Sequence, residues 1–182
     1  MEISNTPNVF ISPSVQEYNY FSGGGTEEYY MNLIADELVP MLMEKGYFVE
    51  RNNPDDSLAE VIQQSNNSKR DIHLAIHSNA GGGEYAERSQ GVEIYYYPYS
   101  EQGKRAAEII ARNYKEIYPN PNAVKLIPTT TLAEITKTRS PAVLIEVGFH
   151  DNPEEAEWIR ENIENIASSL ADSISELLTE NS

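Results

Sequence analysis

Cysteine is absent from the sequence, and its absence limits the cross-links and metal sites that the chain can form. Without thiols the chain has neither disulfide bonds nor thiolate ligands for a metal ion. Any metal must therefore be held by nitrogen and oxygen atoms of histidine, carboxylate or amide side chains.

Basic residues are also scarce. The chain has 13 Lys and Arg against 29 Asp and Glu, which gives a formal net charge of -16 at pH 7. Binding a polyphosphate backbone requires clustered cations, so this balance argues against nucleic acid as a partner. A surplus of acidic residues is instead typical of a soluble protein.

Long apolar runs are missing as well. No stretch approaches the roughly 20 apolar residues that a membrane-spanning helix needs, so we expect no membrane insertion. Residues 1–8 are mostly polar and lack the apolar segment of a signal peptide. We therefore expect a protein that is made in the cytoplasm without a signal peptide.

The rest of the composition is that of a folded protein. Hydrophobic residues make up 40% of the 182 residues and charged residues 23%, an ordinary balance for a globular chain. The length suits one hydrophobic core, and no repeat or low-complexity segment divides it. We expect a single domain over residues 1–182.

Short β-rich runs alternate with stretches of helical spacing. The predicted strands lie at residues 9–11, 47–49, 72–77, 92–97 and 142–147, and residues 126–135 are expected to hold a short strand beside a loop. The predicted helices follow Thr26, Ser57, Ser100 and Asn152, and a last helix spans 163–178. This order predicts an α/β fold with a mostly parallel, mixed central sheet flanked by helices on both faces. An antiparallel pairing is allowed between 72–77 and 92–97, which no helix separates.

The first predicted helix has an apolar face. The residues assigned to that face are Tyr30, Leu33, Ile34, Leu38, Met41 and Leu42.

Three polar residues stand at or near the ends of predicted elements, where functional groups gather. His77 ends an apolar strand, Glu146 interrupts the apolar run 142–147, and Glu28 lies in the first turn of a helix. A lone histidine at a strand end and a glutamate in a first helical turn are more often structural than functional, whereas a carboxylate inside an apolar strand rarely lacks a function. Together they fit a metal centre in which a histidine and a carboxylate bind the ion and a second carboxylate moves protons.

Three motifs occur in order along the chain. They are His-Ser-Asn-Ala at 77–80, Glu-Tyr-Tyr-Met-Asn at 28–32 and Ile-Glu-Val-Gly-Phe-His-Asp-Asn at 145–152. In these motifs the sequence resembles the zinc-dependent N-acetylmuramoyl-L-alanine amidases of the amidase-3 type, from about residue 9 to about residue 171. The resemblance implies a Zn²⁺ enzyme that hydrolyses the amide between N-acetylmuramic acid and L-alanine in bacterial peptidoglycan. It also implies that Glu28 and His77 ligate zinc and that Glu146 is the general acid and base for a zinc-activated water.

One zinc ligand of the family is not present. Family members supply a first histidine in an Asp-Pro-Gly-His segment, whereas residues 12–17 here read Ser-Pro-Ser-Val-Gln-Glu. Gln16 lies nearer the expected position by register than Glu17, and we predict it as the replacement ligand, through its amide oxygen. Glu17 is the alternative, because a carboxylate is the stronger ligand for zinc.

Other residues near these motifs are predicted to contact the substrate. They are Asn79, Arg139 and His150, of which Arg139 could meet a carboxylate of the peptidoglycan stem peptide. His73 lies on the same strand face as His77 but roughly 13 Å away, too far to share one metal ion. We expect His73 to be structural.

Two other functions compete with the amidase. The first is a degenerate, metal-poor amidase fold that serves as a cell-wall binding or regulatory module. The second is a zinc peptidase with another substrate, but the chain lacks a His-Glu-x-x-His motif. We expect the enzyme, acting at the bacterial wall as a phage endolysin or as a bacterial cell-wall hydrolase.

Overall fold

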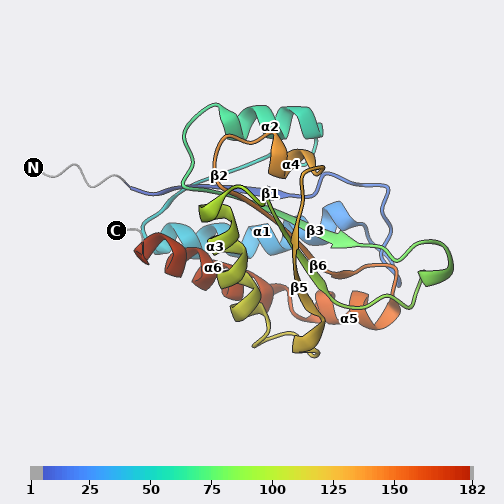
Figure 1. Cartoon of the computed structure of the whole chain (residues 1–182). Coiled ribbons are helices and arrows are strands. Elements are labelled where there is room, and N and C mark those ends of the chain that lie inside the picture. Colours follow the sequence, from blue (N-terminus) through green and yellow to red (C-terminus); the bar gives the residue numbers. More distant parts are fainter. Residues whose placement is uncertain (1–5, 181–182) are drawn as a thin grey trace, which may run out of the picture.

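A six-stranded sheet forms the centre of the protein over residues 6–180, the part of the chain that this computed structural model describes (Figure 1). The strands are β1 (Asn8–Pro13), β2 (Phe48–Arg51), β3 (Ile72–Asn79), β4 (Val92–Tyr96), β5 (Val124–Pro128) and β6 (Ala142–Phe149). The helices are α1 (Glu27–Glu44), α2 (Leu58–Asn66), α3 (Glu101–Tyr114), α4 (Ala133–Thr136), α5 (Pro153–Glu161) and α6 (Ile163–Glu180). Short 3₁₀ turns lie at Gly83–Tyr85 and Pro121–Ala123.

The sheet is mostly parallel. Its strand order is β2-β1-β3-β6-β4-β5, and each neighbouring pair is parallel except β4 with β6. The predicted α/β class, with a mixed sheet and helices on both faces, is confirmed. The antiparallel pairing is not the one that chain order allowed, because β6 lies between β3 and β4 and pairs with β4 itself. β6 takes this central place because nearly all its residues are buried on both faces.

Helices cover the two faces of the sheet unequally. α1, α3 and α6 enclose the main core on one face, where they meet strand residues such as Leu74, Ile76 and Ile145. α2 and α4 lie on the opposite face (Figure 1), over a smaller cluster made of Ala75, Ile135, Ala142 and Leu144. Side chains alternate along a strand, so every second residue of β3 and β6 faces the thinly covered side.

Local capping chemistry explains where the helices begin. Thr26 Oγ1 accepts a hydrogen bond from the backbone N–H of Tyr29 at 3.2 Å. Ser57 and Glu60 form a capping box before α2, and Asn152 caps α5. These helix starts are confirmed, because each capping side chain satisfies a backbone donor that the helix leaves unpaired.

The buried face of α1 differs from the predicted one. Tyr30, Leu33 and Met41 are only partly buried. The buried apolar residues are Met31, Ile34, Ala35, Leu38 and Leu42. These residues recur at intervals of three and four, and four residues before Met31 comes Glu27. The first residue of α1 therefore faces the protein interior.

Residues 126–135 contain more structure than expected. The predicted short strand is present as β5, and the loop after it contains the four-residue helix α4. No helix within residues 6–180 combines the length and the apolar character needed to cross a membrane.

Candidate active site

β3 and β6 carry polar residues on the face beneath α2 and α4. His73 and His77 point to this side of β3, and Glu146 of β6 lies beside His77 in the parallel register. β3 continues past His77 to Asn79, so the histidine lies two residues before the end of the strand and not at its last residue. The strand histidine and the strand carboxylate are nevertheless neighbours.

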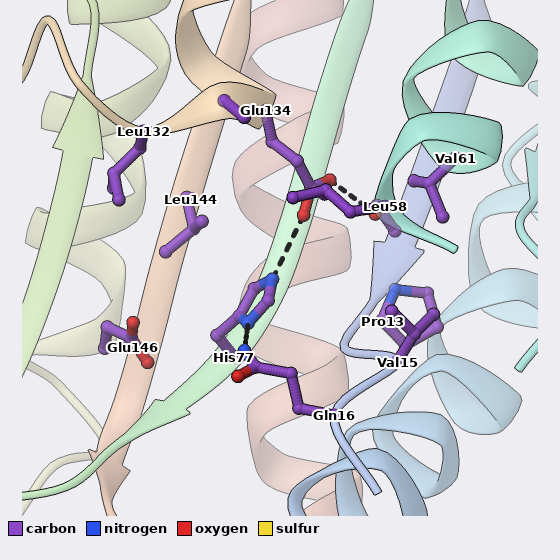
Figure 2. Close-up of a pocket in the computed structure, with 12 residues that line it drawn as sticks. Pro13, Val15, Gln16, Leu58, Val61, His77, Leu132, Glu134, Leu144 and Glu146 are labelled. Atoms are coloured by element: carbon purple, nitrogen blue, oxygen red, sulfur yellow. Dashed lines mark hydrogen bonds and ion pairs between the residues drawn. The ribbon is translucent and has the colours of Figure 1, made fainter. Parts of the chain in front are cut away.

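Side chains from the N-terminal part of the chain gather at His77 Nδ1. This atom lies 3.0 Å from Glu27 Oε1. It also lies 3.4 Å from the side-chain amide nitrogen of Gln16 (Figure 2). Asn19 holds both neighbours, because its amide donates to Gln16 Oε1 at 3.0 Å and to Glu27 Oε2 at 2.6 Å. The first loop and the first turn of α1 thus bring an amide and a carboxylate to one imidazole nitrogen.

Glu27, and not the predicted Glu28, lies beside His77. Glu27 is 1% exposed. Glu28 instead lies in a separate acidic hollow and accepts a hydrogen bond from Asn32. Consecutive helix residues point about 100° apart, so only one of two adjacent carboxylates can face the sheet. The buried face of α1 determines that this residue is Glu27.

Gln16 and Glu17, the two alternatives for the replaced family histidine, also point in different directions. Gln16 lines a cavity together with His77. Glu17 lies in the acidic hollow, where it is hydrogen-bonded to Tyr18. Only Gln16 is therefore within reach of the His77 ring.

A carboxylate that no sequence pattern indicates lies on the other side of His77. Glu134 of α4 is 4% exposed, and its Oε1 lies 3.1 Å from His77 Nε2 (Figure 2). Its Oε2 lies 2.9 Å from His73 Nε2 and accepts a hydrogen bond of 2.6 Å from Ser12 Oγ. The two histidines, too far apart to share a metal ion, share this carboxylate.

The imidazole of His77 is thus held between two carboxylates. Burial alone would lower the pKa of His77, but hydrogen bonds to Glu134 and Glu27 outweigh burial and raise it to about 10. Burial likewise opposes ionisation of the two glutamates, yet their hydrogen bonds with the histidines hold both pKa values below the ordinary value. The site therefore stabilises positive charge between Glu27 and Glu134.

Glu146 has the opposite electrostatic setting. Its Oε2 is one of the few buried side-chain atoms within residues 6–180 that have no hydrogen-bond partner. Burial raises the pKa of Glu146 from the ordinary 4.5 to about 7; His77 opposes this shift, and the charges of Glu27 and Glu93 add to it. A carboxyl group with a pKa near neutrality can both accept and donate a proton.

A cavity of about 380 Å³ opens beside these groups (Figure 2). Its polar wall consists of Ser12, Gln16, His77, Glu134 and Glu146. Its apolar wall consists of Pro13, Val15, Leu58, Val61, Leu132, Ala133 and Leu144. Such a cavity suits a substrate that places a polar reacting group next to small apolar groups.

Two of the predicted substrate contacts lie elsewhere. Arg139 follows α4, donates its backbone N–H to Asn66 Oδ1 at 2.8 Å, and lines a hollow where β3 and β6 begin. His77 and Glu146 lie toward the other ends of these parallel strands. His150 is 4% exposed; its ring stacks on Phe21, and its Nδ1 lies 3.0 Å from Ser78 Oγ. His150 therefore packs the first loop onto the end of β6 and does not line the cavity.

Asn79 lies closer to the site. Its side-chain amide donates to Glu93 Oε2 at 2.9 Å, and Glu93 also accepts a hydrogen bond of 2.6 Å from Tyr95 OH. Glu93 faces Glu146 across the antiparallel register of β4 and β6. Asn79 thus belongs to a polar group beside the unpartnered carboxylate.

Comparison with known protein families gives a match over most of the chain. Residues 15–176 match the family model of N-acetylmuramoyl-L-alanine amidases called Amidase_3. The chain belongs to this family. Its members are hydrolases, and this amidase-family protein is accordingly an enzyme. No curated protein gave a match.

Solved structures of amidases share the fold of this family member. The N-acetylmuramoyl-L-alanine amidase from Clostridium difficile 630 superposes with a TM-score of 0.85 at 21% identity, covering 98% of this chain and 100% of that one. The N-acetylmuramoyl-L-alanine amidase AmiC2 of Nostoc punctiforme superposes with a TM-score of 0.80 at 19% identity, covering 95% of this chain and 97% of that one. The catalytic domain of the CD27L endolysin targeting Clostridia difficile superposes with a TM-score of 0.74 at 20% identity, covering 93% of this chain and 97% of that one.

The amidase family is generally zinc-dependent, and the residues around His77 Nδ1 fit that metal. An imidazole nitrogen and a carboxylate oxygen, both common zinc ligands, lie there with the amide of Gln16. Within the described part of the chain, no group of three or more His, Cys, Asp or Glu is arranged to hold a metal ion, and the third polar group beside His77 Nδ1 is the amide of Gln16. Buried carboxylates around a single imidazole, together with the orphaned Glu146 Oε2, favour an added cation.

Proposed function

We propose that the chain is a zinc-dependent N-acetylmuramoyl-L-alanine amidase, which cleaves the amide between N-acetylmuramic acid and L-alanine of peptidoglycan at the bacterial wall. One observation carries the proposal. Gln16 and Glu27 converge on His77 Nδ1, and Gln16 and His77 line a cavity whose wall also holds the carboxylate of Glu146, with its unpartnered Oε2. This arrangement occurs in a chain of the amidase family.

Gln16, Glu27 and His77 would hold the zinc ion. His77 would contribute Nδ1 and Glu27 its carboxylate. Gln16 would contribute its amide oxygen in place of the neutral histidine that the family supplies, once its amide turns this oxygen from Asn19 toward His77. Zinc bound there supplies a Lewis acid that polarises the scissile carbonyl and acidifies a water molecule. Glu28, the residue implied by the family resemblance, lines a separate hollow and is replaced in this proposal by its neighbour Glu27.

Glu146 is the proposed general acid and base. It takes a proton from the attacking water as the new C–O bond forms at the lactyl carbonyl. It then delivers that proton to the nitrogen of L-alanine as the C–N bond breaks, so the products are a carboxylic acid and a free amine. The raised pKa of Glu146 supports both steps near neutral pH.

The apolar wall of the cavity supports this choice of substrate. The lactyl group and the alanine residue place a methyl group on each side of the scissile amide. Leu58 and Val61 from α2 and Leu132 and Leu144 opposite them provide apolar surface for such groups (Figure 2). We also propose a substrate contact from Asn79, which lies beside the catalytic carboxylate.

A cell-wall binding module is the second candidate function. It is favoured by the amide at Gln16, because a neutral amide binds zinc more weakly than the imidazole it replaces. A site with low metal occupancy would bind peptidoglycan without cleaving it.

Elemental analysis and mass spectrometry of digested walls decide between these functions. We expect about one zinc per chain and new amino-terminal L-alanine residues after incubation of the protein with purified peptidoglycan. Absence of both metal and new termini in excess zinc, with co-sedimentation of protein and wall, would establish the binding module instead.

The role of Glu146 has its own test. The Glu146→Gln variant should lose amidase activity by about 10²- to 10⁴-fold, because loss of a positioned acid and base has this effect. Zinc content should stay near that of the wild type, and the matched variant Glu28→Gln should retain activity. Full activity of Glu146→Gln would refute the mechanism.

A further inference from the structure

Glu134 is the one carboxylate of the site that contacts both histidines of β3. Oε1 lies 3.1 Å from His77 Nε2, and Oε2 lies 2.9 Å from His73 Nε2. Ser12 Oγ donates a third hydrogen bond, of 2.6 Å, to Oε2. Neither zinc binding nor proton transfer, as proposed above, gives this buried residue a task.

The hydrogen bonds of Glu134 determine where the ring protons lie. A carboxylate that receives several hydrogen bonds is stabilised in its ionised, acceptor-only form. Both histidines must then donate through Nε2. For His73 this agrees with its other contact, because Ser65 Oγ lies 2.8 Å from Nδ1 and can donate to it. For His77 it leaves Nδ1 facing Glu27 and Gln16, where a bound metal ion would replace the proton that Nδ1 shares with Glu27.

We propose that Glu134 is a positioning residue that holds His77 in the Nε2–H tautomer and so presents Nδ1 as the metal-binding nitrogen. The inference rests on the proposed function only in taking zinc as the ion. A carboxylate behind a ligating histidine orients the ring and increases its basicity.

The other contacts of Glu134 keep it rigid. His73 is 0% exposed and stacks on the Phe10 ring, with 5.3 Å between the centroids. Ser12 is 1% exposed and lies on β1, which pairs with β3. Glu134 itself belongs to the short helix α4, so contacts from two strands compensate for a helix of only four residues. The carboxylate therefore has one position relative to His77.

Nitrogen NMR of the zinc-loaded wild-type protein tests the tautomer directly. The chain has three histidines, so their ring resonances can be assigned with single variants. We expect His77 to show a protonated Nε2 and a zinc-bound Nδ1, and His73 to show a protonated Nε2. Zinc on Nε2 of His77, or failure to bind zinc at all, would overturn the inference.

The zinc affinities of two variants test how much Glu134 contributes to zinc binding. Glu134→Gln keeps the shape but offers one acceptor and one donor, so it cannot accept from both histidines. The zinc dissociation constant, measured by chelator competition, should rise about 10- to 100-fold. Glu155→Gln removes a buried carboxylate that contacts Tyr118 and the backbone of Gly91 and Phe149, and its zinc affinity should match the wild type.

The outcomes separate this inference from the proposed function. Unchanged zinc affinity in a folded Glu134→Gln variant would refute the role of Glu134 even if the enzyme cleaves peptidoglycan. The expected tautomer and affinity loss, without release of L-alanine termini by the wild type, would refute the amidase and leave Glu134 as a positioning residue. If Glu134→Gln does not fold, the wild-type spectrum decides.

Discussion

Two adjacent glutamates at the start of α1 have opposite surroundings. Glu27 is buried against His77, and Glu28 lies in an acidic hollow with Glu17, Asp55, Asp56 and Glu60. They have the same chemistry and almost the same sequence position. They therefore form a matched pair for testing which carboxylate binds zinc.

Glu27→Gln should weaken zinc binding by at least about 100-fold, because it replaces a charged ligand with a neutral one in a buried site. Glu28→Gln should bind zinc as the wild type does. Chelator competition on the two purified variants measures both values. Equal weakening of the two would show that proximity to His77 does not identify the ligand.

The buried carboxyl of Glu146 predicts a pH-dependent stability. Folding raises its pKa from 4.5 to about 7, so the folded state binds the proton more tightly than the unfolded state. Its contribution is fully present below pH 4.5 and is lost as the pH rises through 7. In the metal-free wild type at pH 8 this loss is about 3 kcal/mol.

Glu146→Gln lacks this titration. In the presence of EDTA the variant should be more stable than the wild type at pH 8, by about 2–3 kcal/mol, and the difference should vanish near pH 4. Urea denaturation at the two pH values measures it. A difference that does not change with pH would contradict a raised pKa at this position.

Some site residues were predictable from the sequence and others were not. His77 and Glu146 belong to motifs with a definite register, Gln16 lies where the family histidine is missing, and the structure brings all three to one cavity. Glu27 was accessible in principle, since it lies four residues before Met31 on the buried face of α1. Glu134 was not accessible, because a helix of four residues has no periodicity that indicates which side chain is buried.

At the scale of elements, the predictable features depend on local chemistry. Capping residues and the alternation of strands with helices depend on neighbours in the sequence, and the structure confirms them. The antiparallel pairing of β4, by contrast, is with β6, which lies more than 40 residues further along the chain. Which distant strands pair depends on how whole strands are buried, so the residue pattern of one segment does not predict its pairing partner.

The glycine before α1 has a role that can be tested at this scale. Gly25 has φ +86°, and an added Cβ would lie 2.5 Å from Tyr30 Cε2. The Tyr30 ring is held by packing on Phe21 and by a hydrogen bond of 3.1 Å from its hydroxyl to Gly24 O. Gly25→Ala should therefore lower the free energy of unfolding by about 2–3 kcal/mol.

Gly46 is the matched control for this substitution. It has φ +89° and no atom within 4 Å of an added Cβ, so Gly46→Ala should lower the free energy of unfolding by only about 1 kcal/mol. Urea denaturation of both variants separates backbone strain from the clash. Equal losses would mean that the Tyr30 ring moves aside.

At the scale of the whole molecule, zinc binding should be visible as thermal stability. Ligand binding to the folded state adds about 2.7 kcal/mol at a free zinc concentration 100 times the dissociation constant. For a chain of this length that corresponds to a rise of about 5–10 °C in Tm. Differential scanning calorimetry with zinc and with EDTA measures the shift. The same Tm in both conditions, in the wild type, would argue against a metal site.

The helices cover the two faces of the central sheet unequally, and this separates the main core from the cavity. The main core lies under α1, α3 and α6, whereas α2 and α4 lie over the cavity and the polar residues. Substitutions on the cavity-facing side of α2 and α4 therefore reshape the cavity while leaving the main core intact. The proposed substrate cavity and the main core thus lie on opposite sides of one sheet, so the shape of the cavity can change without repacking of the main core.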